Sequence, residues 1–408
     1  MKIIYLHQYF NTLSMSGGSR SYEMARRFVL WGHEVHMVTS TRNGYENKAT
    51  RWYKTVEAGI QVHWLQVPYS NQMNFGERIK AFIKFAVASA HKAISLEGDI
   101  VFATSTPLTI AIPAVYAKKR RHLPMVFEVR DLWPDLPIAV GALKNKIMIS
   151  VARWLEQFAY RNADRVVALS PGMRSGILKT GYPQEKIYVI PNSADLKLFE
   201  VPKEESDAFR RQNEWLQNRP LVVYAGTIGH INGVSYLVKI AAATITYKPE
   251  VRFLVVGDGK EKHDIRELAR RLGVLNRNFF MFDTVTKKTV PKILAASTVA
   301  ASLFIDIEEM QHNSANKFFD ALASGTPIAI NYGGWQGEIL HKYKAGIVLN
   351  SKDINLAKDS LIKAIHDDEW LKNAGKNARI VAEEVFDRDK LARKLESVLK
   401  GAIFNNRL

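Results

Sequence analysis

The sequence predicts an α/β protein made of two doubly wound domains, each built on a parallel sheet. A chain of 408 residues is longer than one compact core usually supports. Short apolar runs alternate with helix-like patterns along most of the chain, which is typical of parallel α/β sheets. The alternation stops over the charged stretch Val201–Arg219 and then resumes, so we interpret that stretch as a linker with a short helix.

The first half begins with a βαβ unit. An apolar run at 2–6 is followed by the loop that contains Gly17 and Gly18, by a helical pattern from Arg20 to Gly32, and by a strand at 34–39. Two glycines before a helix let backbone N–H groups approach a ligand, although a tight turn would explain them equally well. Further strands are expected at 59–68, 99–104, 125–129, 165–169 and 187–190, with helices at 74–93, 108–116, 147–161 and 170–181.

The second half repeats the same architecture. Strands are expected at 221–224, 251–256, 279–282, 299–304 and 328–330, with helices at 234–246, 262–272 and 290–296 and a helical, polar remainder to 408. We expect the domains to span 1–197 and 198–387, with a helix at about 388–408 packed back on the first domain. Glycines follow the strand ends, where open α/β sheets bind ligands: Gly226, Gly229, Gly257 and Gly259.

The composition of the chain excludes several classes of functional site and indicates the kind of partner. The chain has no cysteine, which excludes a thiol nucleophile, a thiolate metal site and disulfides. It shows no apolar run of membrane-spanning length and no signal peptide, so we expect a cytoplasmic protein. The net charge of +17 predicts an anionic partner: a nucleic acid, a phosphorylated ligand or an anionic membrane surface.

The stretch Asn313–Pro327 predicts a loop that enters a helix. Ser314 or Asn316 can cap the first turn, and its free N–H groups would attract phosphate. Lys317 opposes the helix dipole there, a poor choice for stability but a good one beside a bound anion. With Asp320 one turn later, the set suits a diphosphate and a ribose hydroxyl. An ordinary capped helix with a surface Lys and Asp is an equally good interpretation.

Two other features carry charge. Arg130 and Asp131 follow the strand at 125–129, at the edge where ligands bind. The helix at 74–93 and the run Lys118–His122 are basic, and an amphipathic basic helix can lie on an anionic bilayer. Packing of its apolar face on the sheet is the alternative. Motifs of P-loop NTPases, zinc proteases and α/β-hydrolases are missing from the sequence.

The order of motifs resembles the family-four retaining glycosyltransferases of GT-B architecture. The motifs that carry the resemblance are H-Q-Y-F, G-G-S-R, V-R-D-L-W-P, A-D-R-V-V-A-L-S-P-G-M, I-P-N-S-A-D, Y-A-G-T-I-G and S-A-N-K-F-F-D-A-L-A-S-G-T-P. V-R-D-L-W-P-D-L-P and N-Y-G-G-W-Q-G-E are similar to a narrower group with the N-acetyl-L-fucosamine transferases of bacterial O-antigen and capsule assembly.

The resemblance implies two Rossmann-like domains that face a central cleft. It implies transfer of a sugar from a UDP-sugar to a polyprenyl-diphosphate-linked saccharide, with retention and with no metal or other cofactor required. The acceptor would bind the first domain and the nucleotide sugar the second. Because such an acceptor stays in the bilayer, the enzyme would be peripheral on the inner face of the cytoplasmic membrane.

The sequence departs from the family pattern at several places. Thr227 and Asn232 stand where the family carries an Arg and a Lys on the diphosphate. Of the family's paired glutamates, the first place holds His312 and the second holds Asp320. The family's His after the V-R strand is also missing. We expect Lys317 to supply the missing charge.

The expected roles follow from this comparison. Lys317 and Arg20 are the candidates for neutralising the leaving diphosphate, and Asp131 for orienting acceptor or donor. The candidates for binding the UDP-sugar are Gly17, Gly18, Gly226, Thr227, Gly257, Gly259, Ser314, Ala315, Asn316, Asp320 and Glu338. A non-hydrolysing UDP-sugar epimerase of the same architecture and a basic nucleic-acid-binding protein remain alternatives, although the chain shows no nucleic-acid-binding motif, so we expect no nucleic-acid partner.

Overall fold

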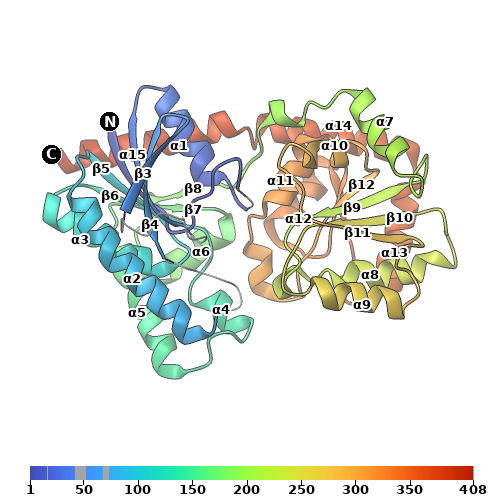
Figure 1. The fold of residues 1–408 in the computed structure, drawn as a ribbon, viewed down its shortest axis with the longest axis horizontal. Helices are drawn as coiled ribbons and strands as arrows, with labels where there is room; N and C mark the ends of the chain where they lie inside the picture. Colours follow the sequence, from blue (N-terminus) through green and yellow to red (C-terminus); the bar gives the residue numbers. More distant parts are fainter. Residues whose placement is uncertain (16, 42–51, 68–72, 408) are drawn as a thin grey trace. The chain divides into compact units, whose positions relative to one another are not determined.

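The computed structural model describes residues 1–15, 17–41, 52–67 and 73–407, and the chain forms two compact units (Figure 1). The first unit comprises Met1–Pro191 and Asp389–Leu408, and the second comprises Asn192–Arg388. Each unit is a largely parallel sheet covered by helices, so the α/β, doubly wound fold predicted from the sequence is confirmed.

The sheet of the first unit has eight strands in the order β3-β4-β2-β1-β5-β6-β7-β8. Neighbours are parallel except β3 and β4, which pair antiparallel. The strands are β1 (Lys2–Leu6), β2 (Glu34–Thr41), β3 (Trp52–Glu57), β4 (Ile60–Gln66), β5 (Ile100–Thr104), β6 (Met125–Val129), β7 (Arg165–Ala168) and β8 (Ile187–Val189).

Alternate residues of β1 divide the core of this unit between the two faces of the sheet. Ile4 and Leu6 pack with α2, α3, α5 and α6, whereas Ile3 and Tyr5 pack with α1 and α15. The helices are α1 (Arg20–Leu30), α2 (Phe75–Ile94), η1 (Leu108–Ile110), α3 (Ala111–Arg121), α4 (Asp135–Ala139), α5 (Lys146–Asn162), α6 (Pro171–Lys179), η2 (Gln184–Lys186) and α15 (Arg388–Arg407).

The sheet of the second unit has six strands in the order β11-β10-β9-β12-β13-β14, all parallel. They are β9 (Leu221–Ala225), β10 (Arg252–Val256), β11 (Phe279–Phe282), β12 (Val299–Ser302), β13 (Ile328–Ile330) and β14 (Gly346–Val348). The helices are η3 (Leu196–Phe199), α7 (Lys203–Gln212), η4 (His230–Asn232), α8 (Ser235–Ile245), α9 (Lys262–Arg271), α10 (Val290–Ala295), η5 (Glu308–His312), α11 (Asn316–Ala323), α12 (Gly334–Tyr343), α13 (Ile354–Ile365) and α14 (Asp368–Glu384).

Each sheet has a point at which the strand order reverses direction. In the first unit, β1 leads to β2 on one side and pairs with β5 on the other. In the second unit, β9 leads to β10 on one side and pairs with β12 on the other. Open α/β sheets bind ligands just beyond the carboxyl ends of the strands at such a point. The residues that follow β1, β5, β9 and β12 are therefore the place to look for function.

Candidate active site

Lys317 lies at the reversal point of the second sheet. Its ammonium nitrogen is 4.7 Å from the ring centre of Tyr224, in β9, and 4.8 Å from that of Phe304, which follows β12. It also donates a hydrogen bond of 3.2 Å to the Tyr224 hydroxyl. That hydroxyl in turn donates to the carbonyl of Thr227 at 2.7 Å. Two aromatic faces and a hydroxyl therefore hold the cation in one position.

The surroundings of Lys317 are neutral. The Asn232 side chain, oriented to satisfy both of its contacts, accepts from the Lys317 ammonium at 3.2 Å and donates to the Thr227 carbonyl at 3.0 Å. Burial lowers the pKa of Lys317 to about 7. Among the described residues, no carboxylate forms an ion pair with it. A bound anion would compensate this charge, because an opposite charge favours the ammonium form.

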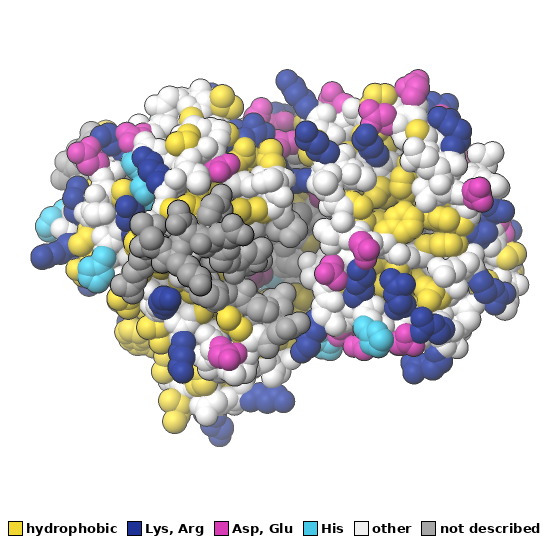
Figure 2. All heavy atoms as spheres, in the orientation of Figure 1, with side chains coloured by type: hydrophobic (Ala, Val, Ile, Leu, Met, Phe, Trp, Pro, Cys, Tyr) yellow, Lys and Arg dark blue, Asp and Glu magenta, His cyan; other side chains and the backbone are white. Residues whose placement is uncertain are grey.

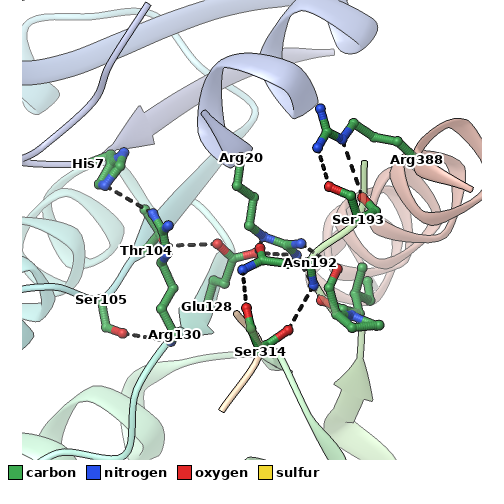
Figure 3. A network of polar contacts seen from close by, with 12 residues as sticks. His7, Arg20, Thr104, Ser105, Glu128, Arg130, Asn192, Ser193, Ser314 and Arg388 are labelled. Carbon is green, nitrogen blue, oxygen red and sulfur yellow. Dashed lines mark hydrogen bonds and ion pairs between the residues drawn. The ribbon is translucent and has the colours of Figure 1, made fainter. Parts of the chain in front are cut away.

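Lys317 is the second residue of the helix α11, and the first turn of this helix has no side-chain cap. The expectation that Ser314 or Asn316 caps it is wrong, because Ala315 occupies the cap position. The Ser314 hydroxyl instead accepts from the Asn192 backbone amide at 3.0 Å, and the Asn192 side chain donates to the Ser314 carbonyl at 2.6 Å (Figure 3). Within the described chain, the backbone amides of Asn316 and Lys317 have no acceptor, so an anion can use them.

Asp320 follows one turn later on α11. Burial raises the pKa of its carboxyl group to about 6, while the nearby charges of Lys287 and Arg388 oppose that shift. Arg388 is itself paired with Asp195 at 2.8 Å. Asp320 therefore lies near a charged cluster of the second unit, and its carboxylate is a hydrogen-bond acceptor when ionised.

The glycines after β9 and β10 bring two loops together. A Cβ atom at Gly257 would lie 2.0 Å from the carbonyl oxygen of Gly226, and one at Gly259 would lie 2.3 Å from that of Ile228. Both glycines also have positive φ angles, 151° and 157°. The packing of these loops requires glycine there, independently of any ligand. The loop of Gly226 and Thr227 is thereby fixed next to Lys317.

Glu338 lies on α12 and is exposed. The helix begins at Gly334, whose φ angle is 72°, and a Cβ atom there would lie 2.5 Å from the carbonyl oxygen of Gln311. The side chain of Trp335 donates to the carbonyl of Asn313 at 2.8 Å. This contact joins α12 to the loop that precedes α11. Glu338 therefore lies on a helix that is hydrogen-bonded to that loop.

In the first unit, three polar residues follow adjacent strands at the reversal point. Arg130 follows β6, and its guanidinium lies 3.2 Å from the Nε2 atom of His7, which follows β1 (Figure 3). The Arg130 backbone amide donates to the hydroxyl of Ser105, which follows β5, at 2.9 Å. No role was predicted from the sequence for His7 or Ser105. Their position in the sequence could have indicated a role, because each comes directly after a strand whose carboxyl end lies at this edge of the sheet.

Asp131 is the next residue and is half-buried. Burial raises the pKa of its carboxyl group to about 6, and the charge of Arg130 opposes the shift. In the part of the chain that the structure describes, its carboxylate accepts no hydrogen bond from another residue. A carboxyl group of raised pKa at a ligand-binding edge is a candidate functional group.

Arg20 forms a buried ion pair in the first unit. Its guanidinium donates to the Glu128 carboxylate at 2.9 and 3.0 Å and to the carbonyls of Ile190 and Pro191 at 2.9 and 2.6 Å. Both charged side chains are buried, and the Thr104 hydroxyl also donates to Glu128 at 2.8 Å. The guanidinium is used inside the fold, which argues against the role expected for Arg20 at the diphosphate.

The loop before α1 contains Gly17, whose φ angle is 124°. The Asn11 side chain donates to the Gly18 carbonyl at 3.3 Å and would collide with a Cβ atom at Gly17. This contact gives Gly17 a structural reason, and the expectation that both glycines meet a ligand stays a prediction.

Histidine and acidic side chains come together nowhere in the described part of the chain in a group of three or more that could bind a metal ion. Nor does any helix there combine the length and apolarity needed to cross a bilayer.

Comparisons with known proteins agree with this architecture. Residues 17–193 match the model of the glycosyl transferase 4-like domain, and residues 205–381 match that of glycosyl transferases group 1. The crystal structure of HepE from Anabaena in complex with UDP-glucose superposes with a TM-score of 0.74, at 17% identity over 98% of this chain and 100% of that one.

Two curated relatives carry glycosyltransferase names. WcaI of Escherichia coli (strain K12), named for glycosyl transfer in colanic acid biosynthesis, is 24% identical over 64% of this chain and 67% of its own. YtcC of Bacillus subtilis (strain 168), named as a glycosyltransferase, is 21% identical over 84% of this chain and 79% of its own. With one glycosyltransferase domain model matched in each unit, the chain belongs to the family-four glycosyltransferases and is a transferase enzyme.

Proposed function

We propose that this enzyme transfers a sugar, with retention, from a UDP-sugar to a polyprenyl-diphosphate-linked saccharide in O-antigen or capsule synthesis. The observation that carries the proposal is the ammonium of Lys317, held at the reversal point of the second sheet with only neutral neighbours. The HepE complex with UDP-glucose supports the same kind of donor.

The donor's diphosphate would lie against Lys317 and the amides of Asn316 and Lys317. As the bond between the sugar C1 and the β-phosphate oxygen breaks, negative charge grows on that phosphate. Donors already fixed there stabilise the charge without reorganising. The acceptor hydroxyl oxygen forms the new bond to C1 on the same face, and its proton passes to the departing phosphate. UDP leaves with the proton, so no protein base or metal ion is needed.

On the acceptor side we propose that Asp131 orients a substrate hydroxyl. Its carboxylate lies next to the Arg130–His7 contact and accepts no hydrogen bond among the described residues. Above a pH of about 6 the group is ionised and acts as an acceptor. Asp320 would contact the ribose, and Glu338 the hydroxyls of the donor sugar.

The resemblance to N-acetyl-L-fucosamine transferases makes an N-acetylated deoxyhexosamine such as N-acetyl-L-fucosamine the first donor to test. The acceptor's lipid fixes the place of the reaction. A polyprenyl diphosphate remains in the bilayer, so the enzyme would work as a peripheral protein on the inner face of the cytoplasmic membrane.

A two-stage experiment tests this function. Thermal shift with UDP, GDP and ADP should show stabilisation by UDP, since a ligand of the native state raises the melting temperature. A panel of UDP-sugars is then incubated with a polyprenyl-diphosphate-linked sugar, and the product's anomeric configuration is read by NMR. A product with the donor's configuration supports the proposal. Conversion of the donor without acceptor, or stabilisation by GDP or ADP alone, would contradict it.

A further inference from the structure

Three helices of the first unit form one outer layer, with α3 between α2 and α5. Their inner faces carry the core residues that pack against β1 and β5, such as Phe85 of α2, Ala114 of α3 and Leu155 of α5. A layer of this kind needs only one apolar face. Any large apolar side chain on its outer face is therefore unexplained by the fold.

The outer face of α5 carries such a stripe. Ile147, Val151 and Trp154 are 75%, 57% and 61% exposed, and their spacing of four and three residues places them on one side of the helix. Trp154 stacks on Phe158, one turn further along, with ring centres 5.3 Å apart. The stripe is thus an ordered apolar ridge that faces solvent along about two turns of α5.

The neighbouring helices extend this ridge into a wider surface. Ile83 and Val87 of α2, and Ile112 and Tyr116 of α3, are also exposed, again in pairs four residues apart. The rings of His91 and Tyr116, 6.3 Å apart, join the two helices. Figure 2 shows hydrophobic side chains gathered over this part of the first unit, at the lower left, with Lys and Arg among them. Exposed apolar side chains gathered in one patch, in contrast to singly scattered ones, mark interaction sites.

The charges of the same three helices indicate an anionic partner. Together α2, α3 and α5 contain eleven Lys and Arg and two Glu, and one of those, Glu156, is buried. The exposed cations include Lys80, Lys84, Lys119, Arg120, Lys146 and Arg153. An apolar ridge bordered by Lys and Arg, with Trp and Tyr on it, is the composition of helices that lie in the interface of an anionic bilayer.

We propose that the outer face of α2, α3 and α5 is a membrane-binding surface, with Ile147, Val151 and Trp154 of α5 inserted between lipids and the cations on the headgroups. This inference deepens the proposed function, since a membrane-bound acceptor requires such a surface. It also extends the sequence-based choice of segments to a third helix. The prediction named the helix at 74–93 and the run Lys118–His122, but the most exposed apolar ridge lies on α5.

Vesicle flotation tests the surface. The full chain is mixed with vesicles of phosphatidylcholine alone or with about a third phosphatidylglycerol, at low and high salt. The wild type should float with the anionic vesicles, and salt should weaken binding. The triple variant I147S/V151S/W154S should lower the bound-to-free ratio about tenfold or more, since three side chains lose burial. K119E/R120E should lower it on anionic vesicles only.

Matched controls lie in the second unit. Leu356 of α13 is as exposed as Val151, so L356S should leave flotation unchanged. K363E/K372E alters two exposed lysines of α13 and α14 and should have little effect beside K119E/R120E. Quenching by bromine-labelled lipids should be smaller in W154F than in the wild type, which places Trp154 itself at depth.

Several outcomes would overturn the inference. The inference is wrong if the wild-type protein does not float with anionic vesicles, or if the triple variant floats as well as the wild type. A wild-type dimer that the triple variant converts to a monomer, with no vesicle binding, would identify the face as an interface between copies. Transfer to a water-soluble acceptor should survive in the triple variant. If vesicles bind but no UDP-sugar reacts, the proposed function fails and this surface stands.

Discussion

The Lys317 ammonium donates to the Tyr224 hydroxyl at 3.2 Å and lies 4.7 Å from the centre of the same ring. One tyrosine therefore contacts the ammonium group in two ways, through its hydroxyl and through the face of its ring. Tyr224 is fully buried in β9, so the strand sets the position of the charge. The arrangement keeps a lysine in place although no carboxylate of the described residues neutralises it.

Replacement of Lys317 by Met should remove most of the activity. Met keeps the apolar contacts with Tyr224 and Phe304 but supplies no charge to the leaving phosphate. Loss of one such donor lowers kcat by roughly 10²–10³-fold. Steady-state kinetics with saturating acceptor measures the change. Lys352, an exposed lysine of the same unit, provides the control K352M, which should behave as wild type. Near-normal kcat in K317M would contradict the role.

The same substitution should stabilise the unliganded protein. Burial lowers the pKa of Lys317 to about 7, while an unfolded lysine titrates near ~10.4. Between these values the unfolded chain holds more protons, so this group makes the unfolding free energy rise with pH across that window. Wild type should gain stability from pH 7 to 9, and K317M should melt higher at pH 7 with less dependence on pH. Thermal melts over this range measure both effects.

UDP binding should take up a proton at pH 8. A diphosphate favours the ammonium form of Lys317, so binding raises a pKa that starts at about 7. The Kd for UDP should then increase as the pH rises above 7, by up to about tenfold per pH unit. Calorimetry in two buffers of different ionisation enthalpy counts the proton directly. The variant K317R, always charged, should lose the pH dependence, and persistence of the full slope there would exclude Lys317 as its source.

Asp131→Asn should slow turnover and change its dependence on pH. Misplacement of one reacting group by a small distance can cost about 10²-fold. The pKa of Asp131 is raised to about 6, so wild-type turnover should fall as the pH drops through 6, and the variant should lack this limb. In the folded protein the group stays protonated between about 4 and 6, so it destabilises the native state as the pH rises through that range. D131N should therefore melt higher at pH 7. Turnover unchanged at all pH values would contradict the assignment.

The Arg20–Glu128 pair should act on stability and not on the diphosphate. Arg20→Met leaves Glu128 buried without its partner, which typically costs about 3–5 kcal/mol. The double variant R20M/E128M removes both charges and should recover much of the loss. Denaturant unfolding of the three proteins gives the coupling energy. At a temperature where R20M is folded, its Kd for UDP should equal the wild-type value; a large loss of affinity would restore Arg20 to the site.

The sequence predicts those parts of the fold in which local pattern and tertiary packing agree. The strands β1 and β11 have the expected bounds, because each is an apolar run between polar residues. The strand β3 was not predicted, since none of its residues is fully buried and its order comes from antiparallel pairing with β4. The strand β14 has three residues and lies within a region that reads as helical, so it too was missed.

The residues of the candidate site also differ in whether the local sequence could indicate them. Lys317 was found because its position at a helix start is locally unfavourable, which a sequence shows. The neighbours that hold it, Tyr224 and Phe304, belong to other strands and carry no local signal. The buried pairing of Arg20 was not predicted for a related reason: its partner Glu128 is 108 residues away, and only the fold brings the two charges together.

The closing helix of the first unit is encoded after the whole of the second. Leu391, Leu395 and Leu399 of α15 fill the same core as Ile3 and Tyr5 of β1. A ribosome must therefore synthesise all of Asn192–Arg388 before the opening strand receives its final covering. During synthesis the first unit would expose one bare flank of its sheet, a natural substrate for chaperones, while the second unit, which is continuous in sequence, would already be complete.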